Sequence, residues 1–493
     1  MISFLKNQRD SHPVRLLIIA GLIVRLLAVI FAKGYGMHDD HFGPIEQPYK
    51  IMTDPSIWDN RGNPHGHSIF YPSIHYHSFK VMNSIGINDP QDKMLIIRFF
   101  HAIYSLLVIW FGYHIALIFS KSKKVAFKVG LVLSLFWIMP FMSVRNLIEM
   151  VTIPPLMAAF YFISKEKEKL FFAGLCFGLA FVFRYQTATF FAGAGLIWLF
   201  KGQLKTILIT SLGFIASVTL IQGTVDWIAW GYPFAAPLEY FLYNTGAAYE
   251  YTTGPFLQYF VLFIGIFIPP LSLLILFGNG VNFKKNMILI IPNLFFFLFH
   301  SAFPNKQERF ILPSIPFTIM IGIVGWEYFI KTSEWWKNRD KLLKGLWSFF
   351  WIINSALLII FTFTYGKKNR VEPLYYLSKI ENVTGVVVET EKMNKISQPK
   401  FYLNKDIPLY IIAKPEMADS VMAEVTYQSD NNWYIIFYGD KRLDQRVQKL
   451  EQLSNWKLEL VKTVEPSLTD WLLHKANPKH NKNQISTIWK VRS

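Results

Sequence analysis

The residues best suited to chemistry in this chain lie in a polar segment that follows its first apolar stretch. Segment 33–95 begins with two adjacent carboxylates, Asp39 and Asp40, and Glu46 follows them closely. A partly buried carboxylate can act as the general base that takes a proton from an alcohol, because burial raises its pKa toward neutrality. Acids are also common in first helical turns and in solvated loops, where they do no chemistry. Both interpretations stay open from the residues alone.

The same segment is rich in histidine. It contains half of the chain's twelve histidines: His38, His41, His65, His67, His75 and His77. Histidines beside carboxylates can hold a divalent metal, but the HxxxH and HExxH spacings are absent. His75 and His77 would share one side of a strand or diverge on a helix. We therefore expect no metal site, and we expect interface histidines to bond phosphate or sugar hydroxyls.

Three later polar segments carry cations that could bind a phosphate. They contain Arg145 with Asn146 and Glu149, then Arg184, and then Lys306 with Glu308 and Arg309 in a tight turn. A single arginine at a membrane–water boundary usually anchors lipid headgroups. Several cations that converge on one face would instead bind a phosphate and stabilise it as a leaving group.

The composition indicates a membrane protein. The 493 residues are 52% hydrophobic and 17% charged, whereas an average soluble protein is roughly 25% charged. The cores of a soluble protein of this size could not bury so much apolar surface. An apolar, aperiodic chain with a single cysteine also excludes a disordered protein, a collagen and a disulfide scaffold.

Eleven apolar segments approach the length of a membrane-spanning helix. They are 14–32, 96–119, 125–142, 147–163, 170–184, 187–200, 206–222, 256–278, 286–303, 310–330 and 345–365. Every second gap between them is short and rich in lysine, so the positive-inside rule assigns those gaps to the cytoplasm. The remaining gaps and the adjoining ends of the spans contain the candidate acids and cations, which are therefore expected on the outer face. Arg25 lies inside the first span and is expected to snorkel or to face the bundle interior.

The chain changes character from about residue 366 onward. Short strands at 386–389, 409–412 and 434–437 alternate with polar helical pieces such as 441–453. We therefore predict an all-α polytopic membrane protein of about eleven transmembrane helices over 1–365, with its candidate catalytic outer loop at 33–95. A small extracytoplasmic α/β domain at 366–493 follows it.

The order of the motifs resembles that of glycosyltransferase family 22. This family comprises GT-C mannosyltransferases, among them the dolichyl-phosphate-mannose enzymes of GPI-anchor and N-glycan assembly. Its first-loop pattern resembles His38-Asp39-Asp40-His41-Phe42 with Glu46, and its later Arg-Ser-x-x-x-Pro resembles His67-Ser68 to Pro72. Further similar elements are 143–149, Arg184, 226–231 and 237–244.

The family signature His-Lys-Glu-x-Arg-Phe resembles Asn305-Lys306-Gln307-Glu308-Arg309-Phe310. Asn305, Gln307 and His67 depart from the His, Glu and Arg of the family patterns. These departures put the sugar and the acceptor in question and leave the scaffold and the donor class intact.

The resemblance implies a GT-C fold and an inverting sugar transfer, of mannose in that family. The sugar would move from a polyprenyl-phosphate carrier to a hydroxyl of a lipid-linked glycan on the extracytoplasmic side. Asp39 would be the general base, with Asp40 as the alternative. The candidate phosphate-binding and substrate-binding residues are Lys306, Arg309, Arg145, Arg184, Glu46, His67 and Glu308. Fixed cations can replace a metal, so we expect neither a metal nor another cofactor.

Two other functions compete with this interpretation. A flippase or transporter of lipid-linked sugars should place its polar residues near the bilayer midplane, whereas here they lie at the outer ends of the spans. A GT-C enzyme of another branch, for aminoarabinose or protein mannosyl transfer, would lack the 306–310 turn.

A nucleic-acid partner is not expected, because the net charge of +17 is spread through short loops. The lysine-, asparagine- and isoleucine-rich tail indicates a bacterial inner membrane protein with its active site toward the periplasm. In a eukaryote the same protein would lie in the endoplasmic reticulum membrane.

Overall fold

The structure is a computed structural model that describes residues 11–64, 66–165, 169–246, 249, 253–390, 397–427, 432–478 and 481–492. His65 and the centre of the basic loop at 165–169 lie outside these ranges. The chain forms two compact units. The first comprises Met1–Ile30, Arg61–Ile74 and Ile97–Thr362, and the second comprises Phe31–Asn60, His75–Ile96 and Phe363–Ser493. Most of the candidate catalytic loop thus belongs to the same unit as the C-terminal domain.

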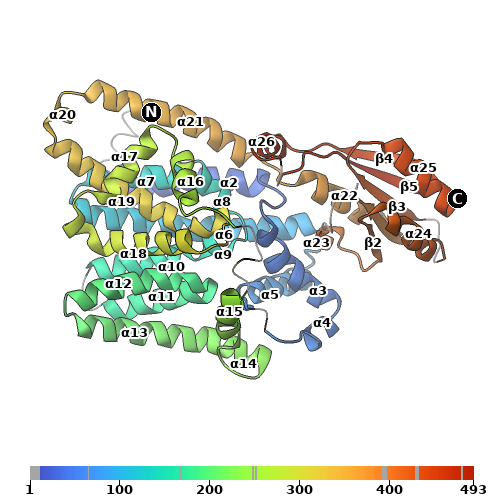
Figure 1. Cartoon of the computed structure of the whole chain (residues 1–493), viewed down its shortest axis with the longest axis horizontal. Coiled ribbons are helices and arrows are strands. Elements are labelled where there is room, and N and C mark those ends of the chain that lie inside the picture. The colour runs from blue at the N-terminus through green and yellow to red at the C-terminus, as the bar shows by residue number, and fades with distance from the viewer. Residues whose placement is uncertain are drawn as a thin grey trace. The chain divides into compact units, whose positions relative to one another are not determined.

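Helices build the first unit (Figure 1). They are α2 (Pro13–Phe31), α6 (Pro90–Ser120), α7 (Lys123–Leu135), α8 (Ile138–Ser143), α9 (Ile148–Val151), α10 (Ile153–Lys165), α11 (Leu170–Phe183), α12 (Ala188–Phe200), α13 (Leu204–Val218), α14 (Thr224–Trp230), α15 (Ala235–Gly246), α16 (Gln258–Ile266), α17 (Leu271–Gly280), α18 (Phe283–Ala302), α19 (Ser314–Thr332), α20 (Glu334–Lys337) and α21 (Asp340–Thr362). Short turns of other helical types lie between them: η4 (Tyr185–Thr187), η5 (Thr219–Gly223) and η6 (Glu308–Ile311).

Each of the eleven expected spans is helical over most of its length. The segment 256–278 differs from the expectation of one helix, because α16 and α17 are separated at Pro269–Pro270. Five helical stretches of the described chain are long and apolar enough to cross a membrane: Pro13–Phe31, Pro90–Ser120, Leu204–Trp230, Phe283–Ala302 and Asp340–Thr362. The count of eleven spans stays a prediction.

Glycines let the helices of the first unit pack closely. A Cβ atom at Gly174 of α11 would lie 2.1 Å from the carbonyl oxygen of Thr210 on α13. A Cβ atom at Gly278 of α17 would lie 2.0 Å from the carbonyl oxygen of Gly322 on α19. Small residues at helix crossings are the usual means of association in a bilayer, where apolar surface alone gives little drive.

Arg25 faces the interior of the first unit. It is fully buried, its Nε donates to Ser105 Oγ at 2.9 Å, and its Nη1 donates to the carbonyl oxygens of Gly21 and Ser134 at 3.1 Å each. Of the two positions expected for this residue, the structure thus shows the interior one. Its hydrogen bonds join α2 to α6 and α7, so it has a structural role.

The second unit combines the loop helices with the C-terminal domain. Its elements are η1 (His38–Asp40), η2 (Phe42–Glu46), α3 (Gln47–Thr53), α4 (Ser56–Asp59), α5 (Phe70–Ser84) from His75 onward, α22 (Lys368–Ser378), α23 (Lys400–Leu403), η7 (Pro415–Met417), α24 (Ala418–Tyr427), α25 (Leu443–Ser454) and α26 (Leu468–Ala476). The first seven residues of α6 also belong to this unit.

The C-terminal domain contains a five-stranded mixed sheet, which confirms the expected α/β domain. Its strands are β1 (Gly385–Glu389), β2 (Leu409–Ile412), β3 (Trp433–Tyr438), β4 (Lys457–Val464) and β5 (Ser486–Arg492). Their order is β2-β1-β3-β5-β4; β1 is parallel to both β2 and β3, and β5 is antiparallel to β3 and β4. The three strands predicted from the sequence are β1, β2 and β3, and the predicted helix at 441–453 is α25.

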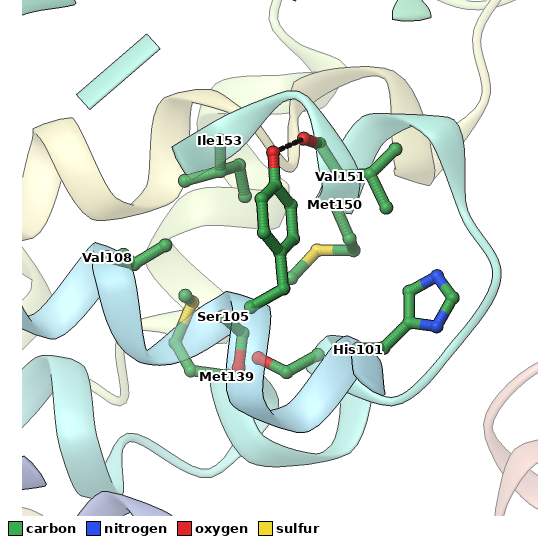
Figure 2. A pocket seen from close by; sticks show the side chains of 9 residues that line it. His101, Ser105, Val108, Met139, Met150, Val151 and Ile153 are labelled. Carbon is green, nitrogen blue, oxygen red and sulfur yellow. Dashed lines mark hydrogen bonds between the residues drawn. The ribbon is translucent and has the colours of Figure 1, made fainter. Parts of the chain in front are cut away.

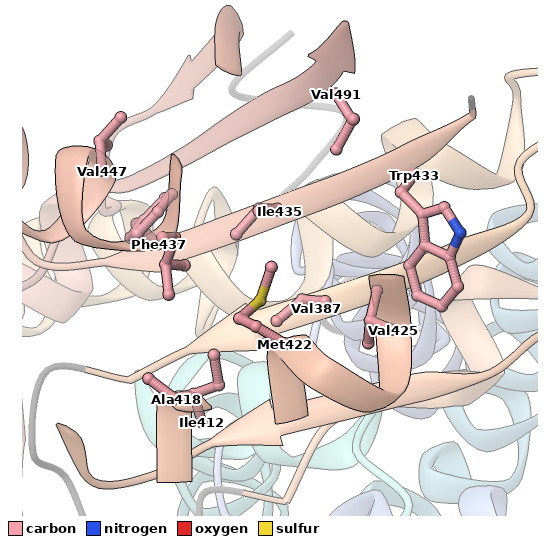
Figure 3. Close-up of a cluster of buried hydrophobic side chains, with 11 residues drawn as sticks. Val387, Ile412, Ala418, Met422, Val425, Trp433, Ile435, Phe437, Val447 and Val491 are labelled. Carbon is pink, nitrogen blue, oxygen red and sulfur yellow. The ribbon is translucent and has the colours of Figure 1, made fainter. Parts of the chain in front are cut away.

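A buried cluster holds this domain together (Figure 3). Ile435 and Phe437 of β3 and Val387 of β1 pack against Met422 of α24. Burying a large apolar side chain stabilises a fold by roughly 1.5–3 kcal/mol. A cluster of this kind gives the domain a core of its own.

Candidate active site

The candidate cations lie where helices of the first unit stop. Segment 144–147 separates α8 from α9, and Pro154 and Pro155 occupy the first turn of α10, where a missing N–H leaves no bond unmade. Arg184 follows the last residue of α11 in extended conformation. Lys306 and Arg309 lie between α18 and α19. Interrupted helices thus bring irregular backbone and charged side chains to the same ends of the bundle.

Glu149 joins two of the predicted cations. Its Oε1 accepts hydrogen bonds from Arg184 Nη1 at 2.6 Å and from Arg309 Nη1 at 2.8 Å. The carboxylate is fully buried and Arg184 is 4% exposed. One negative and two positive charges leave the cluster with a net positive charge, in surroundings where screening by solvent is weak. We call these three residues the arginine cluster.

Phe310 and Gln307 fix the arginine cluster further. The guanidinium carbons of Arg184 and Arg309 lie 4.8 and 5.0 Å from the ring centroid of Phe310, within the range of cation–π attraction. Arg309 Nε donates to Gln307 Oε1 at 2.9 Å. Gln307 stands where the family signature has Glu, and here the amide oxygen orients Arg309.

Parts of the cluster remain available to a ligand. Within the described chain, Nε and Nη2 of Arg184 and Oε2 of Glu149 are buried and have no hydrogen-bond partner. Buried donors without partners are uncommon in folded proteins and call for an explanation. A phosphate oxygen is a suitable partner for a guanidinium, because its lone pairs match the forked donor geometry.

Lys306 is bound within the protein. Its ammonium donates to the carbonyl oxygens of His300 at 2.7 Å and Ser301 at 2.6 Å, and also to that of Phe303. An ammonium has three protons, so all three cap the carboxyl end of α18, where backbone acceptors lack partners. Burial lowers the pKa of Lys306. Its predicted contact with phosphate would require these bonds to be exchanged.

Tyr240 of α15 lies beside the arginine cluster. Burial raises the pKa of its phenol, although the nearby Arg184 and Arg309 act in the opposite direction. Its hydroxyl oxygen accepts a hydrogen bond from Gln186, so its own proton is available for donation. The ring of His67, an exposed side chain, has its centroid 6.1 Å from that of Tyr240.

The other predicted residues of the first unit are placed differently. The guanidinium of Arg145, which is buried, lies 4.7 Å from the ring centroid of Phe141. Glu308 is exposed. The structure therefore brings Arg184 and Arg309 together on Glu149 and places Arg145 on an aromatic ring.

The segment that carries Glu149 packs tightly against α6. A cavity of about 10 Å³ is lined by residues of both, among them His101 and Val151, whose side chains are drawn in Figure 2. The hydroxyl of Tyr104 donates to the carbonyl oxygen of Val151 at 3.0 Å. A cavity of this size holds about one water molecule. It therefore has no room for a substrate, and the bond from Tyr104 helps to position α9 and its carboxylate.

The two adjacent aspartates of the second unit have different surroundings. Asp40 is 2% exposed, and its Oδ2 and Oδ1 accept from the backbone N–H groups of Gly36 at 2.8 Å and Met37 at 3.2 Å. Asp39, its neighbour, is exposed. An oxygen that removes a proton must be reachable by the acceptor hydroxyl. The carboxylate of Asp39 is thus the more accessible of the two, and the role of either as the base stays a prediction.

Glu46 connects the loop to the C-terminal domain. Its Oε2 accepts from the backbone N–H of Phe401 in α23 at 3.1 Å and lies 3.2 Å from Nε2 of His41. The ring of His41 is stacked between those of Tyr35 and Tyr402, with centroid distances of 5.1 and 5.3 Å. Glu46 is 1% exposed, so this carboxylate serves structure in the described contacts.

Two further histidines of the loop, His75 and His77, belong to the second unit. His75 and His77 lie on α5, where side chains two residues apart diverge; His75 is buried and His77 is exposed. Within the described residues, no three of His, Cys, Asp and Glu are grouped so as to hold a metal ion. Metal independence stays a prediction.

Glu149, Gln307 and Tyr240 are site residues that the sequence prediction did not assign. Glu149 belongs to the polar segment 143–149, and a carboxylate in an otherwise apolar span was the available signal. Tyr240 lies in a segment similar to a family pattern, 237–244, without a signal of its own. The contacts of these residues join parts of the chain that are distant in sequence.

Comparison with known protein families identifies relatives over most of the chain. The model of the Alg9-like mannosyltransferase family matches residues 16–397. A probable Dol-P-Man:Man(7)GlcNAc(2)-PP-Dol alpha-1,6-mannosyltransferase of Schizosaccharomyces pombe is 31% identical over 209 residues, which are 40% of this chain and 37% of that protein. The Saccharomyces cerevisiae Dol-P-Man:Man(7)GlcNAc(2)-PP-Dol alpha-1,6-mannosyltransferase is 28% identical over 172 residues, 32% of this chain and 29% of that protein. The matches span about a third of the length of these curated relatives.

Solved structures show the same fold. ArnT from Cupriavidus metallidurans bound to undecaprenyl phosphate superposes with a TM-score of 0.61 and 11% identity, over 96% of this chain and 97% of that chain. Its apo state gives the same score over 97% and 98% of the two chains. At this identity the likeness concerns the fold alone. The GT-C fold and the membrane character expected from the sequence are confirmed.

Proposed function

Since the chain belongs to the Alg9-like mannosyltransferase family, we propose that it is an inverting membrane mannosyltransferase. Its donor is mannose on a polyprenyl phosphate, and its acceptor is a hydroxyl of a lipid-linked glycan. The curated relatives are named for a Dol-P-Man donor and a dolichol-linked acceptor, and the ArnT structure contains undecaprenyl phosphate. These names support a polyprenyl carrier for both substrates.

The observation that carries the proposal is the arginine cluster. Two guanidinium groups share one buried carboxylate, and Arg184 keeps two buried N–H-bearing nitrogens without a hydrogen-bond partner in the described chain. In the transfer, negative charge develops on the phosphate as its bond to C1 of the sugar breaks. Cations fixed in advance stabilise that charge without reorganising. Tyr240 can add a neutral hydrogen-bond donor.

Asp39 acts as the general base in this proposal. The acceptor oxygen attacks C1 from the side opposite the phosphate, the C1–O bond to phosphate breaks, and its electron pair leaves with the polyprenyl phosphate. Asp39 takes the proton of the attacking hydroxyl, and Asp40 maintains the backbone around it through Gly36 and Met37. Because cations of the chain balance the leaving group, no metal is required.

The membrane arrangement follows from the charge pattern. With eleven spans, the positive-inside rule supports an extracytoplasmic position for Asp39 and the arginine cluster and a cytoplasmic position for the lysine-rich connections. In a bacterium this corresponds to the inner membrane with the site toward the periplasm, and in a eukaryote to the lumen of the endoplasmic reticulum. The bilayer delivers both lipid-linked substrates.

The proposal is tested by transfer in vesicles that contain the purified full chain. Radiolabelled mannose on polyprenyl phosphate is supplied with lipid-linked oligosaccharides as acceptors. Wild-type transfer is expected, with a loss of donor kcat/KM in Glu149→Gln, because the carboxylate that orients Arg184 and Arg309 is removed. Thermal unfolding is measured as well, since breaking a buried charge pair costs about 3–5 kcal/mol of folding stability. The matched control is Glu327→Gln, which removes the partner of Lys128 on α7. No transfer by wild type contradicts the proposal.

A chelator tests whether transfer depends on a metal ion. Activity in EDTA is expected to equal activity without it. Loss of transfer in EDTA and its return on addition of a divalent ion would show that the arginine cluster is insufficient at the phosphate.

A further inference from the structure

A second cavity lies within the second unit, formed by residues that the proposed chemistry does not use. Its volume is about 170 Å³. It is lined by Tyr49, Met52, Thr53, Phe79, Asn83, Lys93, Phe401, Asn404 and Asp406, which come from the first loop, from the start of α6 and from the C-terminal domain. Pockets for drug-sized ligands measure about 300 Å³ or more, so this cavity suits one small ring.

Lys93 makes this cavity a candidate binding site. The residue is 4% exposed and lines the cavity, and the carboxylate of Asp89 is a nearby charge that acts on its ammonium. A largely buried lysine loses part of the hydration of its ammonium, which costs free energy unless hydrogen-bond acceptors replace the water. A ligand that brings oxygen acceptors into the cavity would remove that cost.

The charge of the lining indicates a neutral ligand. Asp406, which is exposed, provides one negative charge against the positive charge of Lys93. A phosphate or another anion would gain from the lysine and be repelled by the carboxylate. A ligand with both donors and acceptors would use the two groups together.

The other lining groups fit a sugar ring. Phe401 packs against Tyr49 and Phe79, with ring centroids 5.7 and 5.2 Å apart. Nδ2 of Asn404 donates to the carbonyl oxygen of Asn88 at 3.1 Å, which fixes the orientation of its amide, and Asn83 carries a second, exposed amide. A pyranose combines an apolar C–H face with a rim of hydroxyls, and therefore matches aromatic rings bordered by amide, carboxylate and ammonium groups.

We propose that this cavity binds one neutral sugar residue of the glycan acceptor, with Lys93, Asp406 and Asn83 at its hydroxyls and Phe401 at its apolar face. No bond forms or breaks there. The proposal rests on the proposed function, because a glycan acceptor supplies the sugar. It assigns acceptor recognition to the shared surface of the loop and the C-terminal domain.

Binding of free mannotriose to the purified full chain tests the cavity, with inorganic phosphate as the competing probe. Titration calorimetry is expected to show mannotriose binding that weakens at least about tenfold in Lys93→Met and in Asp406→Asn, since each substitution removes a charged group that hydrogen-bonds a sugar hydroxyl. The controls Lys80→Met and Asp419→Asn change exposed residues of α5 and α24 and should bind as wild type does. Asp406 is exposed, so its variant should fold even if Lys93→Met does not.

Three results overturn the cavity assignment: no mannotriose binding by wild type, equal binding by the Asp406→Asn variant, and preference for inorganic phosphate. Transfer kinetics separate it from the proposed function. A raised acceptor KM with an unchanged donor KM in Asp406→Asn supports the assignment, and an unchanged acceptor KM contradicts it. If wild type transfers no mannose, the proposed function fails, while the binding measurements still decide on the cavity.

Discussion

Buried carboxylates serve two different ends in the two units of this protein. In the first unit, Glu149 bonds two guanidinium groups, so its cluster keeps a net positive charge. In the second, Asp40 bonds backbone N–H groups, and Glu46 bonds the N–H of Phe401 and lies beside His41. Through these hydrogen bonds, the second pair holds chain segments in place.

The two sets of carboxylates differ in their hydrogen-bond partners, and both sets are buried away from water. A single carboxylate that bonds two cations neutralises only one of the two positive charges. The remaining positive charge is poorly screened and can attract an anion. A carboxylate that accepts from backbone amides stabilises a loop. This contrast leaves Asp39, exposed beside Asp40, as the acid with a reachable carboxylate in that pair.

The largest effect is expected from Asp39→Asn. Loss of a general base lowers turnover by about 10²–10⁴-fold, and the fold should persist because the side chain is exposed. Asp40→Asn should instead lower the unfolding temperature, since it weakens the bonds to Gly36 and Met37. Single-turnover transfer and thermal unfolding measure the two effects. Wild-type turnover in Asp39→Asn would remove this residue from the mechanism.

Arg309→Ala should have the next largest effect. It removes one cation from the arginine cluster, and hydrogen bonds to charged groups are worth about 1.5–3 kcal/mol, so donor kcat/KM should fall by roughly 10- to 100-fold. Arg446→Ala is the matched control, because this arginine pairs with Glu389 in the C-terminal domain and its Nε donates at 2.8 Å. Equal donor kinetics in the two variants would show that the cluster does not hold the phosphate.

Local patterns were sufficient to predict the elements that carry these sites. The eleven helical segments and the strands β1 to β3 followed from apolar runs and residue types in short windows. β4 and β5 were missed. β4 has the largely exposed pattern of a strand with little buried face, so charged residues such as Lys457, Glu459 and Lys462 hid its periodicity.

Contacts between distant residues could not be predicted in the same way. Glu149 meets Arg184 across 35 residues and Arg309 across 160, and Glu46 meets Phe401 across 355. The residue types were visible, but their pairing depends on how the helices pack. The hydrogen bonds of Lys306 could not be predicted from the sequence either. They reach carbonyl oxygens at the end of α18 because the chain reverses direction after Ala302.

Glu46→Gln should have a smaller effect that distinguishes structure from binding. The amide cannot form a charge-assisted bond with the N–H of Phe401, and the expected loss is about 1 kcal/mol of unfolding free energy. Hydrogen exchange at the amides of α23 should detect local opening. Unchanged exchange together with lost transfer would instead assign Glu46 to substrate binding, as the sequence first indicated.

The last prediction concerns pH and appears only above about pH 9. Burial raises the pKa of Tyr49 from 10.0 to about 12, and the charges of Glu46 and Asp406 add to this. Below the pKa of Tyr49 in the unfolded chain, the phenol is protonated in both the folded and the unfolded state, and the folded state keeps all the stability that the protonated phenol contributes. As pH rises above about 10, the unfolded state loses its proton first, so the stabilisation is progressively lost up to about pH 12.

Tyr49→Phe should therefore flatten the fall of unfolding temperature between about pH 9 and pH 11. Tyr249→Phe, at an exposed residue, is the control and should follow wild type. Because Tyr49 lines the second cavity, the same pair of variants also reports whether the loop stays packed on the C-terminal domain. Identical pH curves for Tyr49→Phe and wild type would mean that the phenol titrates alike in both states, and that the carboxylates of the second unit do not act on it.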